Sequence, residues 1–277
     1  MKKILVTTDF SDKSKAGLLF AIQLAAQYKF DLTFFHAYHI LTPTAWNIVR
    51  IEKYEEEQTK IIQDKLNVFV EKIYKNLNLT KSDRKCVIKS SVFPQSCITE
   101  YAVDNKFDFI CISTRGAGKL ERFLGTNTAN LINHSDTPVI AVPYNYKPTK
   151  ITRILYASDL VHLEKELKNV VDFAKPLKAI VELLHFTSPL ETIIDPKVIE
   201  LAVKKFSKYN VKLHIKNTDY VKTMIANIET AIKNTKPSML IMFTEQNRSL
   251  FQKIFLSSKS AEYSFNAKVP LLVFNKS

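Results

Sequence analysis

The sequence predicts an α/β protein built from two tandem, doubly wound parallel sheets of five strands each. The chain has 277 residues, which is enough for two domains of about 140 residues. Short, nearly continuous apolar runs alternate with longer amphipathic stretches, a pattern typical of strands that are buried on both faces and connected by helices. The second half also repeats the motifs of the first half in the same order.

The internal repeat pairs segments that lie far apart in the chain. Residues 4–9 (ILVTTD) recur as residues 154–159 (ILYASD), and residues 32–36 (LTFFH) recur as residues 181–185 (VELLH). The remaining pairs are 108–114 with 238–244, and 123–142 with 255–274. A repeat of this length indicates that one folding unit has been duplicated.

Each half contains five predicted strands. In the first half they lie near residues 3–8, 31–37, 85–90, 108–113 and 138–142, and in the second half near 152–157, 179–186, 211–216, 238–243 and 269–274. Helices are predicted between the strands of the first half, near residues 13–28, 50–77, 94–105 and 126–134. Right-handed crossovers then place helices on both faces of each sheet.

The predicted domain boundary lies in a polar connection that carries Pro143 and Pro148. Neither a helix nor a sheet continues easily through residues 144–150. We therefore expect one domain over residues 1–146 and a second domain over residues 147–277. The two domains are expected to pack on each other as a pseudo-dimer, through the last strand of each.

The formal net charge of +13, from 40 Lys and Arg against 27 Asp and Glu, raises nucleic acid as a partner. The charge is spread over both halves, with no block of Lys and Arg interleaved with aromatic residues, and Glu55-Glu56-Glu57 lies in a predicted polar helix. A solvated basic surface is therefore favoured. Nucleic-acid binding is kept as the weaker alternative, which predicts an affinity that falls steeply with salt.

Apolar and cysteine patterns predict a cytoplasmic protein without a membrane span. The longest apolar stretch, residues 18–26, is far shorter than the roughly 20 residues that cross a bilayer. The first apolar run, residues 4–6, is too short for a secretory signal. Cys86, Cys97 and Cys111 are odd in number and lack CxxC spacing, so we expect reduced core cysteines and no structural metal.

Glycines mark the most informative segment of the chain. Three of the four, Gly116, Gly118 and Gly125, lie within ten residues, after a predicted strand and before a predicted helix. Glycine lets a ligand approach the backbone closely. A helix start offers unsatisfied N–H groups and the positive end of a dipole to a phosphate, and Thr126 or Thr128 supplies a hydroxyl donor.

The same segment also has a structural interpretation. Gly125-Thr126 can be a tight helix N-cap, with Arg115, Lys119 and Arg122 as solvated charges. Cations beside a glycine loop suit a phosphate equally well. The order of strand, glycine loop and helix favours the phosphate site here.

At these residues the chain resembles the universal stress protein family. ATP-binding members of that family carry Gly-x2-Gly-x9-Gly-Ser/Thr after the fourth strand, an Asp at the end of the first strand, and a closing strand introduced by Pro-Val. This sequence has Asp9 after its first strand, Gly116 and Gly125-Thr126 in the loop, and Pro138-Val139 at the last strand. The resemblance covers both copies and implies a Rossmann-like fold for each.

The sequence departs from the family pattern at the loop. Ser113 stands where the pattern has its first glycine, and eight residues instead of nine separate Gly116 from Gly125. Each change narrows the room for a phosphate, because a Cβ and a shorter loop both restrict its approach. The second half keeps the spacing from Thr244 to Ser257-Ser258 without any glycine, so a nucleotide is expected in the first domain only.

The resemblance implies a ligand, ATP with or without Mg²⁺ or AMP, and the residues that hold it. Thr8 and Asp9, with Thr7 beside them, would lie against the base and ribose, and Ala37 near the adenine. The phosphates would be held by Ser113, Thr114, Arg115, Gly116, Gly118, Gly125, Thr126, Asn127 and Thr128. From the residues alone, Asp9 has a second interpretation as a cap before the first helix, which Asp159 at the equivalent place supports.

No residue is assigned a catalytic role. His36 and His185 occupy equivalent positions on apolar strands, and hydrogen-bonded core histidines are favoured because the second copy lacks the rest of a site. The sequence has no GxSxG elbow and no GxxxxGK[ST] loop. We therefore expect binding rather than turnover, with slow ATP hydrolysis left open.

Two hypotheses of function follow. The first is a stress-response regulator whose bound ATP or AMP biases its conformation or its choice of a protein partner. The second is a nucleotide-free interaction or scaffold protein that keeps the fold while its altered loop excludes phosphate. The identity of the protein partner and the formation of a homo-oligomer beyond the pseudo-dimer are left open.

Overall fold

The elements of the first half follow the predicted order. The computed structural model describes residues 1–79, 84–114, 126–187, 196–206, 208–209, 211–217, 224–244 and 269–275. The first-half elements are β1 (Lys2–Thr7), α1 (Lys15–Gln27), β2 (Phe30–Tyr38), α2 (Ile48–Asn76), β3 (Lys85–Ser90), α3 (Pro94–Asp104), β4 (Phe109–Thr114), α4 (Thr126–His134) and β5 (Val139–Pro143).

The second half repeats this order of strands and helices. Its elements are β6 (Arg153–Ala157), α5 (Leu163–Leu177), β7 (Ile180–Thr187), α6 (Pro196–Lys204), β8 (Val211–Asn217), α7 (Met224–Thr235), β9 (Met239–Thr244) and β10 (Leu271–Asn275). All the predicted strands are present, each within two residues of its expected bounds. The alternation of apolar runs and amphipathic stretches therefore identified these elements correctly.

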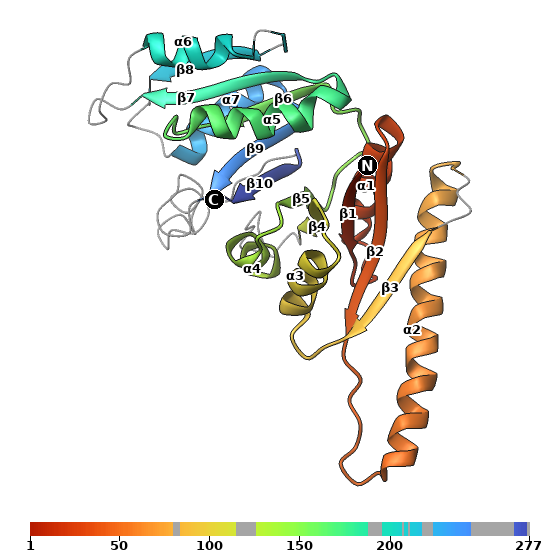
Figure 1. Ribbon diagram of the computed structural model, residues 1–277. Helices are drawn as coiled ribbons and strands as arrows, with labels where there is room; N and C mark the ends of the chain where they lie inside the picture. Colours follow the sequence, from red (N-terminus) through yellow and green to blue (C-terminus); the bar gives the residue numbers. More distant parts are fainter. Residues whose placement is uncertain are drawn as a thin grey trace.

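The described strands form one continuous sheet in the order β3-β2-β1-β4-β5-β10-β9-β6-β7-β8 (Figure 1). Neighbouring strands are parallel throughout, except that β5 and β10 are antiparallel. The two halves thus have the same internal strand order and meet at their last strands. The prediction of two doubly wound five-stranded sheets packed as a pseudo-dimer is confirmed.

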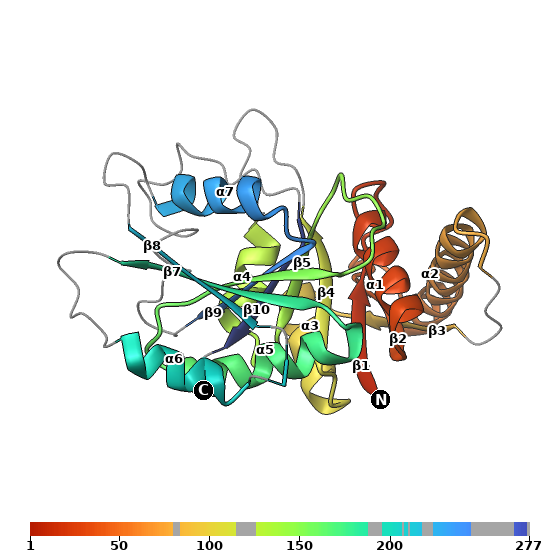
Figure 2. The ribbon, with the colours of Figure 1, turned by 90° about the horizontal axis from the view of Figure 1, so that it is seen from above.

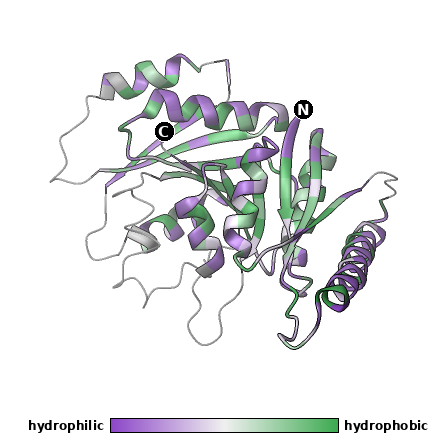
Figure 3. Ribbon diagram, turned by 60° about the horizontal axis from the view of Figure 1, so that its bottom comes forward, coloured by the Kyte–Doolittle hydropathy of each residue, from purple (hydrophilic) through white to green (hydrophobic). Residues whose placement is uncertain are grey.

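Helices cover both faces of the sheet. Helices α1, α2, α5 and α6 contribute to one hydrophobic core, and α3, α4 and α7 contribute to the core on the opposite face. Figure 2 shows α7 on one side of the second-half strands and α5 with α6 on the other. The strands are therefore apolar on both faces, and the hydrophobic colour in Figure 3 is concentrated in them.

The junction between the halves is apolar and aromatic. Leu272 of β10 pairs with Ile140 of β5, and both side chains are fully buried. Phe109 of β4 lies edge-on to Phe173 of α5 at 5.5 Å between ring centroids, and 6.3 Å from Phe274 of β10. The expectation that the domains pack through their last strands is therefore confirmed.

The connection between the halves is bonded to α1. Residues 144–152 contain neither helix nor strand, as their composition predicts. Gln27 Nε2 donates to Ile151 O at 2.7 Å, and Ile151 N donates back to Gln27 Oε1 at 2.8 Å. Tyr146 OH donates to Gln23 Oε1 at 3.2 Å. The connection is thus a packed segment of the structure.

Gly17 allows α1 to approach β4 closely. A Cβ at this position would lie 3.1 Å from Ser113 N, which is tighter than an ordinary contact. The absence of a side chain places the turn before α1 beside the carboxyl end of β4. This approach shapes the site described below.

The three cysteines are free thiols. Cys111 is fully buried, whereas Cys86 and Cys97 are half-buried at the margins of the core. Burial raises the pKa of the Cys86 thiol to about 11, so this thiol stays protonated at neutral pH. Within the described part of the chain, no helix is both long and apolar enough to cross a membrane.

The junction predicts a strong effect of Leu272→Ala. Removal of a fully buried side chain from the central strand pair leaves a cavity, and we expect a loss of about 2–5 kcal/mol in the free energy of unfolding, measured by urea titration. The matched control is Ile215→Ala on the edge strand β8, where Ile215 is 43% exposed. Equal losses in the two variants would contradict the central role of the junction.

Candidate functional site

A cavity of about 290 Å³ lies at the carboxyl ends of β1, β2 and β4. Strand β1 has β2 on one side and β4 on the other, so the cavity lies where the strand order reverses, the usual position of ligands in open α/β sheets. Its lining residues are Thr7, Thr8, Asp9, Ser11, Lys13, Ser14, Phe35, His36, Ala37, Pro94, Gln95, Ile98, Ile112, Ser113, Asn127, Thr128 and Leu131.

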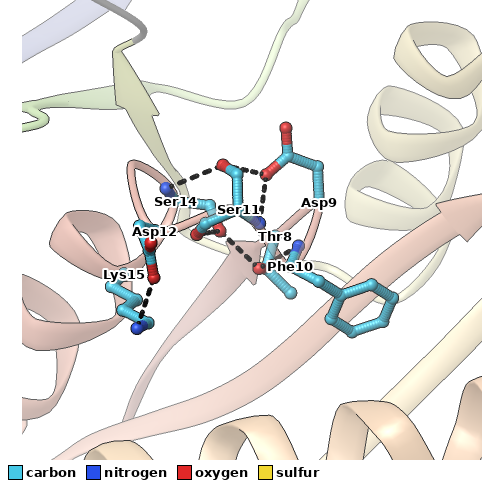
Figure 4. A network of polar contacts seen from close by, with 7 residues as sticks. All are labelled: Thr8, Asp9, Phe10, Ser11, Asp12, Ser14 and Lys15. Atoms are coloured by element: carbon cyan, nitrogen blue, oxygen red, sulfur yellow. Dashed lines mark hydrogen bonds and ion pairs between the residues drawn. The ribbon is translucent and has the colours of Figure 1, made fainter.

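Hydroxyl and carboxylate groups fix the turn between β1 and α1 (Figure 4). Thr8 Oγ1 accepts from Phe10 N at 3.1 Å and lies 2.8 Å from Ser14 Oγ. Asp9 Oδ1 accepts from Ser11 N at 3.0 Å and from Ser11 Oγ at 2.6 Å. Phe10 has a φ of 64°, a left-handed conformation that non-glycine residues adopt at a cost. The surrounding bonds stabilise this strained turn.

The second half contains the same turn. Leu160, equivalent to Phe10, has a φ of 67°. Its N–H donates to Ser158 Oγ at 3.0 Å, and Val161 N donates to Asp159 Oδ1 at 3.1 Å. The aspartate therefore stabilises the turn in both copies. It is not the helix cap that the structural interpretation predicts, because Ser14 holds the N-cap position of α1. In the first half Asp9 also lines the cavity, so a role in the turn and a role toward a ligand are compatible.

Both strand histidines form an equivalent hydrogen bond. Nδ1 of His36 lies 2.8 Å from Thr8 O, and Nδ1 of His185 lies 2.9 Å from Ser158 O. A carbonyl only accepts, so Nδ1 carries the proton in each ring. Burial lowers the pKa of His36, and the Thr8 carbonyl and Asp9 oppose this shift. These contacts fit the expected hydrogen-bonded histidines.

Ser113 connects β4 to the turn before α1. Its Oγ donates to Lys13 O at 2.6 Å. The hydroxyl at the position of the missing glycine therefore has a structural partner, which sequence reasoning did not foresee. Lys13 itself lines the cavity, and its Nζ lies 5.7 Å from the Tyr144 ring centroid. This lysine supplies a cation at the site.

Two helices begin at the cavity. Helix α3 starts at Pro94 and α4 at Thr126. Gln95 Nε2 donates to Asn127 Oδ1 at 2.9 Å, and Asn130 Nδ2 donates to Gln95 Oε1 at 3.3 Å. These amides hold the two helix starts together. Positive helix ends and a lysine favour an anionic ligand.

The cavity brings together seven of the residues predicted from the sequence. They are Thr7, Thr8, Asp9, Ala37, Ser113, Asn127 and Thr128. Thr114 is buried at the end of β4 and does not line the cavity. Thr126 begins α4. The predictions for Arg115, Gly116, Gly118 and Gly125 fall outside the described residues.

Sequence reasoning missed the contributions of Lys13 and Gln95. Lys13 lies just before α1, and from the sequence alone a lysine there cannot be distinguished from a solvated charge. Its place in the cavity lining depends on Gly17 and Ser113, which fix the position of the turn. Gln95 follows Pro94, the first residue of α3. Its amide partner Asn127 lies 32 residues away, and local patterns do not reveal such a pair.

The second half has a buried polar contact of its own on the α5 face of the sheet. Tyr156 stands at the position of Val6 in the repeat, and its hydroxyl contacts Glu166 Oε2 and lies 2.9 Å from Ser158 Oγ. Tyr156 is fully buried and Glu166 nearly so. Within the described residues, no group of three or more His, Cys, Asp or Glu side chains is arranged to hold a metal ion.

The fold and the cavity define a class of protein. A pocket at the carboxyl ends of parallel strands, beside helix N-termini, is the arrangement of nucleotide-binding α/β proteins. The family model described as "Universal stress protein family" matches residues 1–143. The chain therefore belongs to the universal stress protein family.

Solved structures are similar over the whole chain. A universal stress protein from Archaeoglobus fulgidus aligns with a TM-score of 0.70 and 16% sequence identity, over 99% of this chain and 98% of that one. A putative universal stress protein from Pseudomonas aeruginosa aligns with a TM-score of 0.56 and 14% identity, over 99% and 93%. At these identities the likeness establishes the fold. No curated protein matches the sequence significantly.

The lowered pKa of His36 predicts a pH effect on stability. The unfolded chain binds a proton at His36 near pH 6.5, whereas the folded chain binds it only at lower pH. His36 therefore makes stability fall as pH drops below about 6.5. Urea unfolding at about pH 7.5 and about pH 5.5 should show a smaller loss for His36→Gln than for the wild type.

The control for this experiment is His39→Gln, because His39 is exposed. We expect the His39→Gln variant to lose stability with falling pH as the wild type does. Identical pH dependence of the His36→Gln variant and the wild type would contradict the prediction.

Proposed function

We propose that the first half binds an adenine nucleotide, ATP or AMP, and that the protein is a cytoplasmic stress-response regulator rather than an enzyme. One observation carries this proposal. Seven residues that the family resemblance assigns to the nucleotide, from four separate segments of the chain, line a single cavity. Membership of the universal stress protein family supports the regulatory role.

The chemistry of the cavity suits the parts of a nucleotide. Its apolar side chains, including Ile98, Ile112 and Leu131, suit a planar base. The carboxylate of Asp9 is a strong acceptor for ribose hydroxyls. Lys13 and the start of α4 are suited to phosphate, because a cation and a helix N-terminus stabilise negative charge. The phosphates would extend toward α4.

Two titratable groups of the cavity lining, Asp9 and His36, bear on whether a bound nucleotide would be hydrolysed. Asp9 is the acidic residue among them, and its Oδ1 already accepts two hydrogen bonds from Ser11. Nδ1 of His36 is engaged with Thr8 O. The carboxylate of Asp9 is thus engaged in the turn, whereas Nε2 of His36 is the unprotonated nitrogen of its ring. Binding without turnover is proposed from the family membership. Mg²⁺, where present, would be held mainly by phosphate and water.

The second half has a structural role in this proposal. We propose a domain boundary between residues 146 and 147, inside the connection bonded to α1. The second domain covers the last strand of the first, so it completes the sheet that carries the cavity. A nucleotide bound at the first domain would then bias how the tandem pair meets a protein partner.

Calorimetric titration of ATP and of AMP into the full chain tests the proposal. We expect one nucleotide per chain, and Asp9→Asn should weaken binding about tenfold or more, because a hydrogen bond to a charged group contributes about 1.5–3 kcal/mol. Asp159→Asn is the matched control, since Asp159 stabilises the equivalent turn in the second half. It should leave the affinity unchanged.

The outcomes of the titration separate the two hypotheses. No heat of binding up to millimolar nucleotide, from a folded protein, would overturn the nucleotide proposal and leave the nucleotide-free scaffold as the better account. Equal weakening by Asp9→Asn and Asp159→Asn would show that the turn acts through folding alone.

Asn127→Asp tests the placement of the phosphates. The change preserves shape and the acceptor for Gln95, but adds a negative charge at the start of α4. We expect ATP affinity to fall more than AMP affinity, because ATP carries more negative charge. Asn133→Asp, about two turns further along α4 and outside the cavity lining, is the control and should have a smaller effect. Equal effects on both nucleotides would argue against phosphates at α4.

A further inference from the structure

A second, larger cavity lies in the second half, between the start of α5 and α6. Its volume is about 830 Å³, which is within the range of small-molecule sites, about 300–1,000 Å³. Leu160, Leu163 and Ile199 line it as buried residues, each at most 7% exposed. Val161 and Leu201 also line it and are 62% and 61% exposed. We call this cavity the α5–α6 groove.

In the first half the corresponding place is filled by aromatic rings. Phe10, the equivalent of Leu160, packs edge-on against Phe69 of α2, with 5.7 Å between ring centroids. Nζ of Lys65 lies 4.6 Å from the Phe10 centroid. Among the described residues, the lining of the α5–α6 groove contains no Phe, Tyr or Trp. The repeat thus closes an apolar space in one copy and leaves it open in the other.

Positive charge surrounds the α5–α6 groove. Lys165, Lys204 and Lys205 line it together with Glu164, so lysines outnumber carboxylates in its described lining. Lys205 Nζ lies 2.7 Å from Glu164 Oε2, an ion pair that connects α6 to α5. An apolar interior with a basic rim is complementary to a ligand with an apolar chain and an anionic head.

We propose that the α5–α6 groove binds a long-chain carboxylate of the fatty-acid type. The chain would lie over Leu160, Leu163 and Ile199, where its burial removes apolar surface from water. The carboxylate would lie at the rim near Lys165 and Lys204. This site is separate from the nucleotide cavity and does not depend on it.

Titration of the full chain with cis-parinaric acid, a fluorescent long-chain carboxylate, tests this site below the micellar concentration. We expect saturable binding of one molecule per chain and competition by dodecanoate. Dodecylammonium should compete less well, because its charge is repelled by the lysines. ATP should not compete, since its proposed site lies in the other half.

Three variants probe the α5–α6 groove directly. Ala202→Trp should abolish binding by filling it. Leu201→Ser should weaken binding by removing an exposed apolar wall. Lys204→Glu should weaken dodecanoate binding about fivefold, the effect of one exposed ion pair. Val68→Ser is the matched control, because Val68 is a 50% exposed residue of the equivalent helix α2, and it should leave binding unchanged.

Several outcomes would overturn the proposal. These are the absence of saturable binding to a folded protein, equal weakening by Leu201→Ser and Val68→Ser, and dodecylammonium competing as well as dodecanoate. Sedimentation of the wild type and of the Ala202→Trp variant can give one further outcome that would overturn it. A dimer in the wild type that becomes a monomer in this variant, without dodecanoate binding to either, would assign the α5–α6 groove to a second copy of the chain.

Discussion

The pairing of β5 with β10 is the interaction on which the arrangement of the molecule depends. Each half ends in a short strand whose side chains are almost all buried. Left unpaired, such a strand would expose apolar side chains and unsatisfied backbone groups, the usual template for aggregation. In the antiparallel pair, the backbone groups of each strand are hydrogen-bonded by the other strand. Phe109 and Phe274 extend the apolar contact into the core. The second half therefore contributes to the structure through this pairing, although it has no glycine loop of its own.

A comparison of the two copies distinguishes the residues that the fold requires from the residues that a ligand would require. The left-handed turn, its aspartate and the histidine that bonds to the strand end occur in both copies, so they are requirements of the fold. The cavity of the first copy adds Lys13 and the amide pair of Gln95 with Asn127. Residues that differ between the copies are therefore the better guide to function.

Much of the fold could be predicted because its signals are local or repeated. The apolar run of β4, for example, identifies a strand buried on both faces, and its counterpart β9 shows the same pattern. The contribution of Ser113 could not be predicted in this way, since its partner Lys13 O lies 100 residues away. The α5–α6 groove was equally hidden, because one of its lining residues, Leu160, stands where the first copy has a phenylalanine. A leucine and a phenylalanine are equivalent in a hydrophobicity pattern but differ in the volume that they fill.

The antiparallel junction also determines the separation of the two cavities. Ligands of parallel sheets lie at the carboxyl ends of the strands, and the strands of the two halves run in opposite directions where they meet. The nucleotide cavity lies at the carboxyl ends of β1, β2 and β4, and the turn after β6 that lines the α5–α6 groove therefore lies at the opposite end of the strands. Two ligands held in this way cannot touch or compete for space. An effect of one bound ligand on the binding of the other would then be transmitted through the strands of the shared sheet.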